Sequence, residues 1–115
     1  MRLPEHDPAL PVVCFDLDGT LAADTWPSPR VGDPDEHALN ALVHYHDQGC
    51  EVVVFTARPE SHFPRIWRWL EDNLVAWAVY DVTNRKPVAS LYFDDRAVRW
   101  PLTGDVSTTS LEETA

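Results

Sequence analysis

The sequence contains only two cysteines, Cys14 and Cys50. Cys14 falls inside an apolar run, and Cys50 comes just before the next one. A free cysteine in such surroundings behaves as a small buried hydrophobic residue, and nothing in the pattern indicates an oxidising compartment. We therefore expect two structural thiols, with a redox pair as the less favoured alternative.

Long apolar runs are also missing. No stretch approaches the roughly 20 apolar residues that a membrane-spanning helix requires. Residues 1–11 contain Glu5, Asp7 and three prolines where a signal peptide would have an apolar segment. The sequence therefore predicts no membrane association and, by default, a cytoplasmic protein.

Basic residues are scarce, with 9 lysines and arginines against 19 acidic residues and a formal net charge of −10. Such a chain repels nucleic-acid phosphates and lacks the basic stripe of a non-specific binder. Polyanion binding is disfavoured, although a local group of arginines could oppose the overall charge. This group would comprise Arg58, Arg65, Arg68, Arg96 and Arg99.

The remaining composition is that of a folded domain. The chain has 115 residues, of which 44% are hydrophobic, and five tryptophans. This length allows one domain with a single core. We expect an N-terminal arm at residues 1–10, a catalytic domain at 11–102 and a flexible polar tail at 103–115.

Apolar runs that are typical of buried strands alternate with segments of helical spacing. We expect strands at about 11–16, 51–56, 75–82 and 90–93. Strands that alternate with helices imply right-handed crossovers and a mainly parallel sheet. The predicted fold is a three-layered, Rossmann-like α/β fold.

Two helices are expected between these strands. For the first, Asp33 is the predicted N-cap, Pro34 the first helical residue and Gly49 the stop signal. The second is expected to begin near residues 61–64 and to end at about Asn73, with Trp67 in the core.

Polar residues follow three of the apolar runs. The first run leads into Asp16-Leu17-Asp18-Gly19-Thr20, the second into Thr56-Ala57-Arg58 and the last into Asp94-Asp95, with Lys86 between the second and the last. Aspartate and glycine are common in turns, so the first motif alone does not decide between a surface turn and a functional site. The carboxyl ends of parallel strands meet at one edge, where ligands bind. The second acidic pair therefore favours a functional site.

In this order, the residues resemble the four motifs of the haloacid dehalogenase superfamily of aspartate-nucleophile phosphohydrolases. The resemblance covers roughly residues 11–100. It implies that Asp16 is a nucleophile that forms an aspartyl-phosphate, and that Asp18 is the general acid and base. It also implies that Thr56 donates a hydrogen bond to the phosphoryl oxygens and that Lys86 neutralises their charge and that of Asp16.

The gathered carboxylates also predict a metal. Two carboxylates about 5 Å apart repel by roughly 3 kcal/mol at an effective dielectric constant of about 20, and a divalent cation relieves this repulsion. Ligation by oxygen alone favours Mg²⁺. We assign Asp16 and Asp94 as direct ligands, Asp95 as a direct or water-mediated ligand and, as the resemblance implies, Asp18 through its backbone carbonyl.

Several residues keep two interpretations. Arg58 is a candidate for substrate binding, or it braces an acidic group. Arg85 could replace Lys86 as the functional cation, and Asp95 could simply cap a turn. Trp26 either stacks on a substrate ring or packs against the domain.

The chain leaves no room for the cap domain of larger superfamily members. Only residues 21–33 and 75–85 stand where a cap would be inserted. An open site suits bulky phosphates, or a small substrate covered by a second subunit of a homo-oligomer. The expected substrate is a phosphorylated small molecule or nucleotide. The chain also resembles the phosphatase module of polynucleotide kinase, which would suit a polynucleotide 3′-phosphate, but the net charge opposes this.

The sequence thus predicts a capless, Mg²⁺-dependent phosphatase. Two alternatives remain open at this stage. One is a catalytically silent module that binds a metal or a partner. The other is a phosphotransferase whose acceptor is not water.

Overall fold

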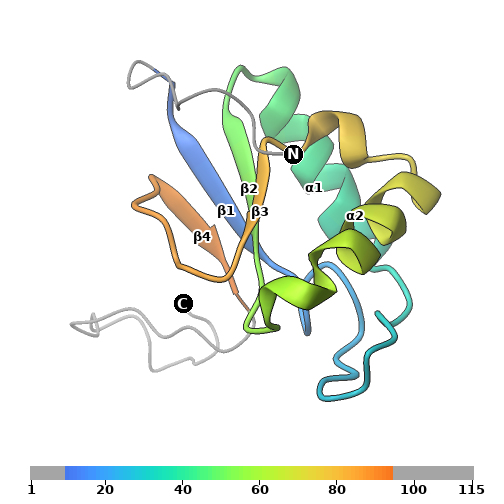
Figure 1. The fold of residues 1–115 in the computed structure, drawn as a ribbon. Helices are drawn as coiled ribbons and strands as arrows, with labels where there is room; N and C mark the ends of the chain where they lie inside the picture. The colour runs from blue at the N-terminus through green and yellow to red at the C-terminus, as the bar shows by residue number, and fades with distance from the viewer. Residues whose placement is uncertain (1–9, 95–115) are drawn as a thin grey trace, which may run out of the picture.

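The structure is a computed structural model that describes residues 10–94 (Figure 1). The predicted arm up to residue 9, the predicted tail and Asp95 lie outside these residues. In chain order the elements are β1 (Val12–Asp16), α1 (Glu36–Asp47), β2 (Glu51–Phe55), a 3₁₀ turn (Glu60–His62), α2 (Phe63–Asp72), a second 3₁₀ turn (Ala76–Ala78), β3 (Asp81–Thr83) and β4 (Leu91–Phe93).

The four strands form one sheet in the order β3-β2-β1-β4, and every neighbouring pair is parallel. β1 therefore lies inside the sheet, paired with β2 from Val12↔Glu51 to Asp16↔Phe55. This arrangement confirms the predicted Rossmann-like α/β fold with a parallel sheet. Its consequence for function is that all four strands end at the same edge.

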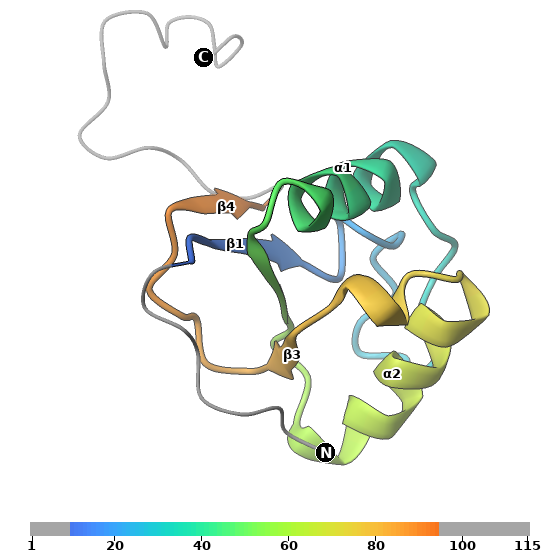
Figure 2. The ribbon, with the colours of Figure 1, turned by 90° about the horizontal axis from the view of Figure 1, so that it is seen from above.

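Both helices cover the same face of the sheet, as the view in Figure 2 shows. Alternate residues of β1 and β2 pack beneath them in a single core, because side chains alternate between the two faces of a strand. Each large aliphatic side chain that is fully buried here contributes roughly 1.5–3 kcal/mol to stability. The core includes Val13, Phe15, Val52 and Val54 from the strands and Leu42, Ile66 and Leu70 from the helices.

No helix covers the opposite face within residues 10–94, so the described part has two layers rather than the three that we expected. The connection 84–90 crosses this face from β3 to β4 (Figure 2). It is too short for a helix of several turns, and it contains Pro87.

The first helix begins later than its sequence signal suggests. Its N-cap is Asp35, whose carboxylate accepts a hydrogen bond from the Ala38 backbone N–H at 2.9 Å. The prediction of Asp33 as N-cap is wrong, because the chain there is still paired with the loop after β1. Ala23 donates to the Asp33 carbonyl at 2.8 Å, and Pro34 bridges to Ala22.

The third strand is shorter than predicted. Instead of a strand from residue 75, Ala76–Ala78 forms a 3₁₀ turn, and only Asp81–Thr83 pairs with β2. Leu74, at a φ of 63°, ends α2 in a left-handed conformation, and Val75 then donates back to the Leu70 carbonyl at 3.0 Å. Tertiary pairing, rather than the apolar composition, fixes where the strand begins.

Neither helix within residues 10–94 is long and apolar enough to cross a membrane.

Candidate active site

The first motif lies where β1 ends and the chain turns away from the sheet. Asp16 is the last residue of β1. Leu17, which is fully buried, donates its backbone N–H to the Phe55 carbonyl at 2.9 Å. Gly19 then adopts a φ of 93°, which is strained for any residue with a Cβ. The turn thus holds two carboxylates at the carboxyl edge of the sheet on either side of an anchored leucine.

The last motif lies beside the first one. Phe93 of β4 pairs with Phe15 of β1, so Asp94 and Asp16 follow directly paired residues on neighbouring parallel strands. The structure therefore brings together two predicted site residues that stand far apart in the sequence. Asp95, the remaining predicted ligand, lies outside the described residues.

Lys86 joins this pair from the β3–β4 connection. Its Nζ donates to Oδ2 of Asp94 at 3.1 Å and lies 5.0 Å from the centroid of the Phe55 ring. The hydrogen bond to Asp94 is the main cause of a raised pKa for Lys86, and the charges of Asp94 and Asp16 act in the same direction. Lys86 is thus a cation held at the edge where both carboxylates stand, as predicted.

Thr56, directly after β2, is 1% exposed. Its backbone N–H donates to the Thr83 carbonyl at 2.9 Å, and its hydroxyl oxygen accepts from the Arg58 backbone N–H at 3.0 Å. The hydroxyl keeps its own proton as a donor. A contact of this hydroxyl with a phosphate stays a prediction, because the hydrogen bonds also suit a strand-end residue that only closes a turn.

Arg58 has a fully buried side chain that binds Asp18 in a forked ion pair. Nε donates to Oδ2 of Asp18 at 3.0 Å and Nη2 to Oδ1 at 2.8 Å. The guanidinium also donates to the Ser28 carbonyl at 2.7 Å and to the Thr25 hydroxyl at 3.2 Å. This burial favours the bracing interpretation of Arg58 over direct contact with a substrate.

Trp26 covers Arg58 from the loop after β1. The guanidinium carbon lies 5.1 Å from the centroid of the indole, and the His62 ring meets the indole at 5.7 Å, edge to face. Trp26 therefore packs against the domain, as one of its two interpretations expects, although 42% of its surface remains exposed.

The sequence did not identify the loop residues that hold Arg58. Thr25 and Ser28 belong to an irregular segment, and an isolated hydroxyl or carbonyl in such a segment carries no pattern that marks it. Ser28 lies 30 residues from Arg58 in the chain, so its contact with Arg58 can be recognised only in the folded structure.

The residues at this edge fit a magnesium ion in their donor chemistry. The Asp18 carboxylate is engaged by Arg58, so Asp18 would reach a metal only through its backbone carbonyl. Asp16 and Asp94 would supply the carboxylates, and oxygen ligands with room for water and phosphate suit Mg²⁺. Within residues 10–94 no group of three or more His, Cys, Asp and Glu side chains is arranged to hold a metal.

Cys14 lies within β1, two residues before Asp16, and is 2% exposed. Burial raises the pKa of its thiol to about 11; Lys86 lowers it in part, while Asp16 and Asp94 raise it further. Cys50 is half-buried, and both thiols are free. Cys14, which is more deeply buried than Cys50, therefore fits the expected structural role better.

We expect Cys14 to resist thiol reagents at neutral pH. In the variant Cys50→Ser, at pH 8, roughly one Cys14 thiol in a thousand is ionised, since the pH lies about three units below the pKa. The rate of alkylation by iodoacetamide, measured by mass spectrometry, should rise about tenfold per pH unit from 7 to 9. A rate that levels off near pH 8.5, like that of an ordinary thiol, would contradict the burial of this side chain.

A conserved protein from Bacteroides thetaiotaomicron is similar in structure, with a TM-score of 0.65 over 77% of this chain and 78% of the other. This likeness shows the fold. At 20% sequence identity it carries no statement about chemistry. No family model matches this chain, and a search of curated proteins found no match.

Proposed function

We propose that this protein is a Mg²⁺-dependent phosphohydrolase that cleaves a phosphate monoester through an aspartyl-phosphate on Asp16. The observation that carries this proposal is the meeting of Asp16 and Asp94 at the ends of paired strands, with Lys86 bound to Asp94. Catalysis of phosphoryl transfer consists mainly of positioning the reactants and stabilising their charge. This edge offers the Asp16 carboxylate as a nucleophile and Lys86 as a cation.

In the proposed reaction, a carboxylate oxygen of Asp16 attacks phosphorus as the bond to the ester oxygen breaks. Protonated Asp18 gives its proton to the departing oxygen. The resulting Asp18 carboxylate then takes a proton from water as that water attacks the aspartyl-phosphate, which releases inorganic phosphate and restores Asp16. Lys86 and the Thr56 hydroxyl would stabilise charge on the transferred group.

Arg58 is compatible with this role of Asp18. Each oxygen of a carboxylate can accept two hydrogen bonds, and Arg58 uses one site on each oxygen of Asp18. A site for a proton therefore remains on either oxygen. Arg58 would act as a positioning residue that fixes the direction in which Asp18 presents its acid group.

Magnesium would be held by the carboxylates of Asp16 and Asp94, the backbone carbonyl of Asp18 and, from outside the described residues, Asp95. When bound, it would reduce the repulsion between the phosphate and Asp16 and orient the phosphoryl oxygens.

The test of metal dependence uses the purified protein and p-nitrophenyl phosphate. We expect phosphate release in millimolar MgCl₂, its loss in excess EDTA and its return when Mg²⁺ is restored. Circular dichroism in EDTA is the control for folding, because the core of residues 10–94 consists of apolar side chains. Turnover that is unchanged after exhaustive chelation would refute the metal assignment.

A catalytically silent, partner-binding module is the second candidate. The forked ion pair between Arg58 and Asp18 favours this candidate, because such a pair stabilises the loop whether or not the protein is an enzyme. Beryllium fluoride would separate the two, since it binds an aspartate that accepts phosphate. ¹⁹F NMR of the protein with Mg²⁺ and beryllium fluoride should show a bound signal that Asp16→Asn removes.

We also propose that the protein is located in the cytoplasm and acts on a phosphorylated small molecule or nucleotide, alone or as a homo-oligomer. If the acceptor were an alcohol rather than water, the protein would be a phosphotransferase, which product analysis would detect.

A further inference from the structure

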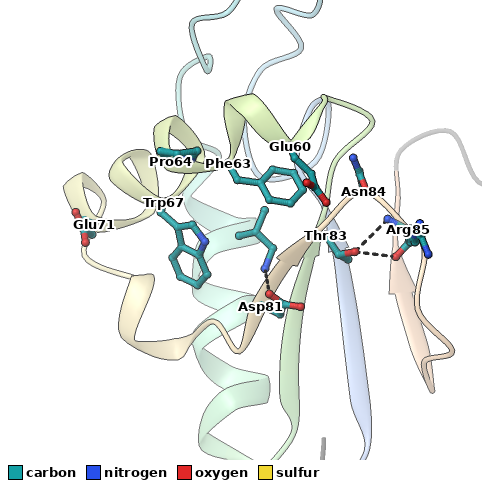
Figure 3. A pocket seen from close by; sticks show the side chains of 10 residues that line it. Glu60, Phe63, Pro64, Trp67, Glu71, Asp81, Thr83, Asn84 and Arg85 are labelled. Carbon is teal, nitrogen blue, oxygen red and sulfur yellow. Dashed lines mark hydrogen bonds between the residues drawn. The ribbon is translucent and has the colours of Figure 1, made fainter. Parts of the chain in front are cut away.

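An open cavity of about 810 Å³ lies between α2 and the outer side of β3. β3 is the last strand of the described sheet on that side. Figure 3 shows Phe63 and Trp67 of α2 facing the strand, with Glu60 and Asp81 beside them. The volume is in the range of cavities that hold small organic ligands.

The rim of this cavity borders residues that follow β2 at the candidate active site. Thr83 accepts the backbone hydrogen bond of Thr56 at 2.9 Å, and the Asn84 amide reaches the Arg58 carbonyl at 3.5 Å. Arg85, also at the rim, directly precedes Lys86. To reach the cavity, the organic part of a phosphate ester bound at Asp16 would extend along the strand ends from β1 past β2.

The lining of the cavity has the chemistry of a site for an organic cation. Two aromatic rings and three carboxylates line the cavity, with Glu60 and Glu71 at its opposite ends and Asp81 on β3 (Figure 3), while Arg85 supplies the one cation in the lining. Aromatic faces and carboxylates both attract a protonated amine, and a desolvated aromatic face does so strongly. A neutral ligand would lack this charge attraction, and an acidic ligand would be repelled by the carboxylates.

The charge of the whole chain favours the same class of ligand. A phosphate monoester carries a charge of about −1.5 to −2 at pH 7, and the protein has a net charge of −10. Long-range repulsion therefore slows the approach of a simple phosphate ester. An amine on the organic part lowers the net charge of the substrate while leaving its phosphate intact.

We propose that the cavity between α2 and β3 binds the protonated amine of a phosphorylated amino alcohol, so that such esters are the preferred substrates. This inference rests on the proposed phosphatase activity. Glu60 and Glu71 would attract the amine, and Trp67 would bind it against its ring face.

The test compares ω-aminoalkyl phosphates of two to eight carbons with ω-hydroxyalkyl phosphates of the same lengths. We expect kcat/KM to favour the amine at least tenfold at one or more lengths. The double variant Glu60→Gln/Glu71→Gln, or Trp67→Leu, should reduce that ratio at least threefold while hydrolysis of p-nitrophenyl phosphate is retained. Calorimetry with the free amino alcohols, which contain no phosphate, should detect binding that these variants weaken.

The control is the double variant Glu36→Gln/Asp47→Asn, which makes the same change in charge at exposed positions of α1. It should leave the ratio unchanged. The inference is overturned if no length prefers the amine, or if the cavity variants behave like the control. Failure of every phosphate ester, p-nitrophenyl phosphate included, would instead reject the phosphatase itself.

Discussion

Asp16→Asn is expected to lower the rate of phosphate release at least about 10³-fold, in the range seen when a nucleophile is removed from an enzyme. The asparagine side chain has nearly the same shape as aspartate but no negative charge with which to attack phosphorus. Initial rates with p-nitrophenyl phosphate at saturating Mg²⁺ measure the effect. Because Asp16 stands at the end of β1, the substitution leaves the apolar core intact, and the thermal transition should stay cooperative.

Asp72→Asn is the matched control for this experiment. It makes the same chemical change at an exposed residue, at the end of α2, and should leave the rate within twofold of wild type. If Asp16→Asn kept more than a tenth of the activity, the nucleophile would have to be another residue. If both variants and the wild type lacked activity and beryllium fluoride binding, the silent module would be the better description.

The core strands could be predicted because their signal is local. A continuous apolar run such as Val12–Phe15 is typical of a strand buried on both faces of a parallel sheet, and β1 occupies nearly the predicted residues. The start of α1 could not be predicted in the same way. Asp33 and Asp35 both carry an N-cap side chain, and only the bridge between Pro34 and Ala22 decides between them.

The candidate site was likewise predictable only in part. The proximity of Asp16 and Asp94 follows from parallel topology, which places every strand end at one edge, so sequence order was enough to predict it. The partner of Arg58 could not be predicted from the sequence. Asp18 stands 40 residues away, and the loop carrying Thr25 and Trp26, which also contacts the guanidinium, has no pattern that marks it.

Arg58→Ala is expected to cause the largest loss of stability of any single change at the site. Removing one partner of a buried ion pair typically costs 3–5 kcal/mol, because the other charge is left without compensation. Here the side chain of Asp18 is 14% exposed and that of Arg58 0%. The Ser28 carbonyl and the Trp26 ring would lose their contacts with the guanidinium as well.

Equilibrium unfolding in urea, followed by circular dichroism, measures this loss. Arg58→Lys should fall between wild type and Arg58→Ala, since an ammonium group keeps the charge but cannot form the fork. Arg65→Ala, at an exposed position of α2, is the control and should leave the unfolding midpoint unchanged. A midpoint for Arg58→Ala equal to that of Arg65→Ala would mean that the ion pair does not hold the loop.

A double-mutant cycle separates the ion pair from the other contacts of Arg58. If Asp18 is the main partner, Arg58→Ala should cost much less in an Asp18→Asn background, because no unpaired carboxylate then remains. The coupling energy should reach about 1–3 kcal/mol. A coupling near zero would assign the stabilisation to Thr25, Ser28 and Trp26 instead. The ion pair would then make no contribution to the stability of the fold.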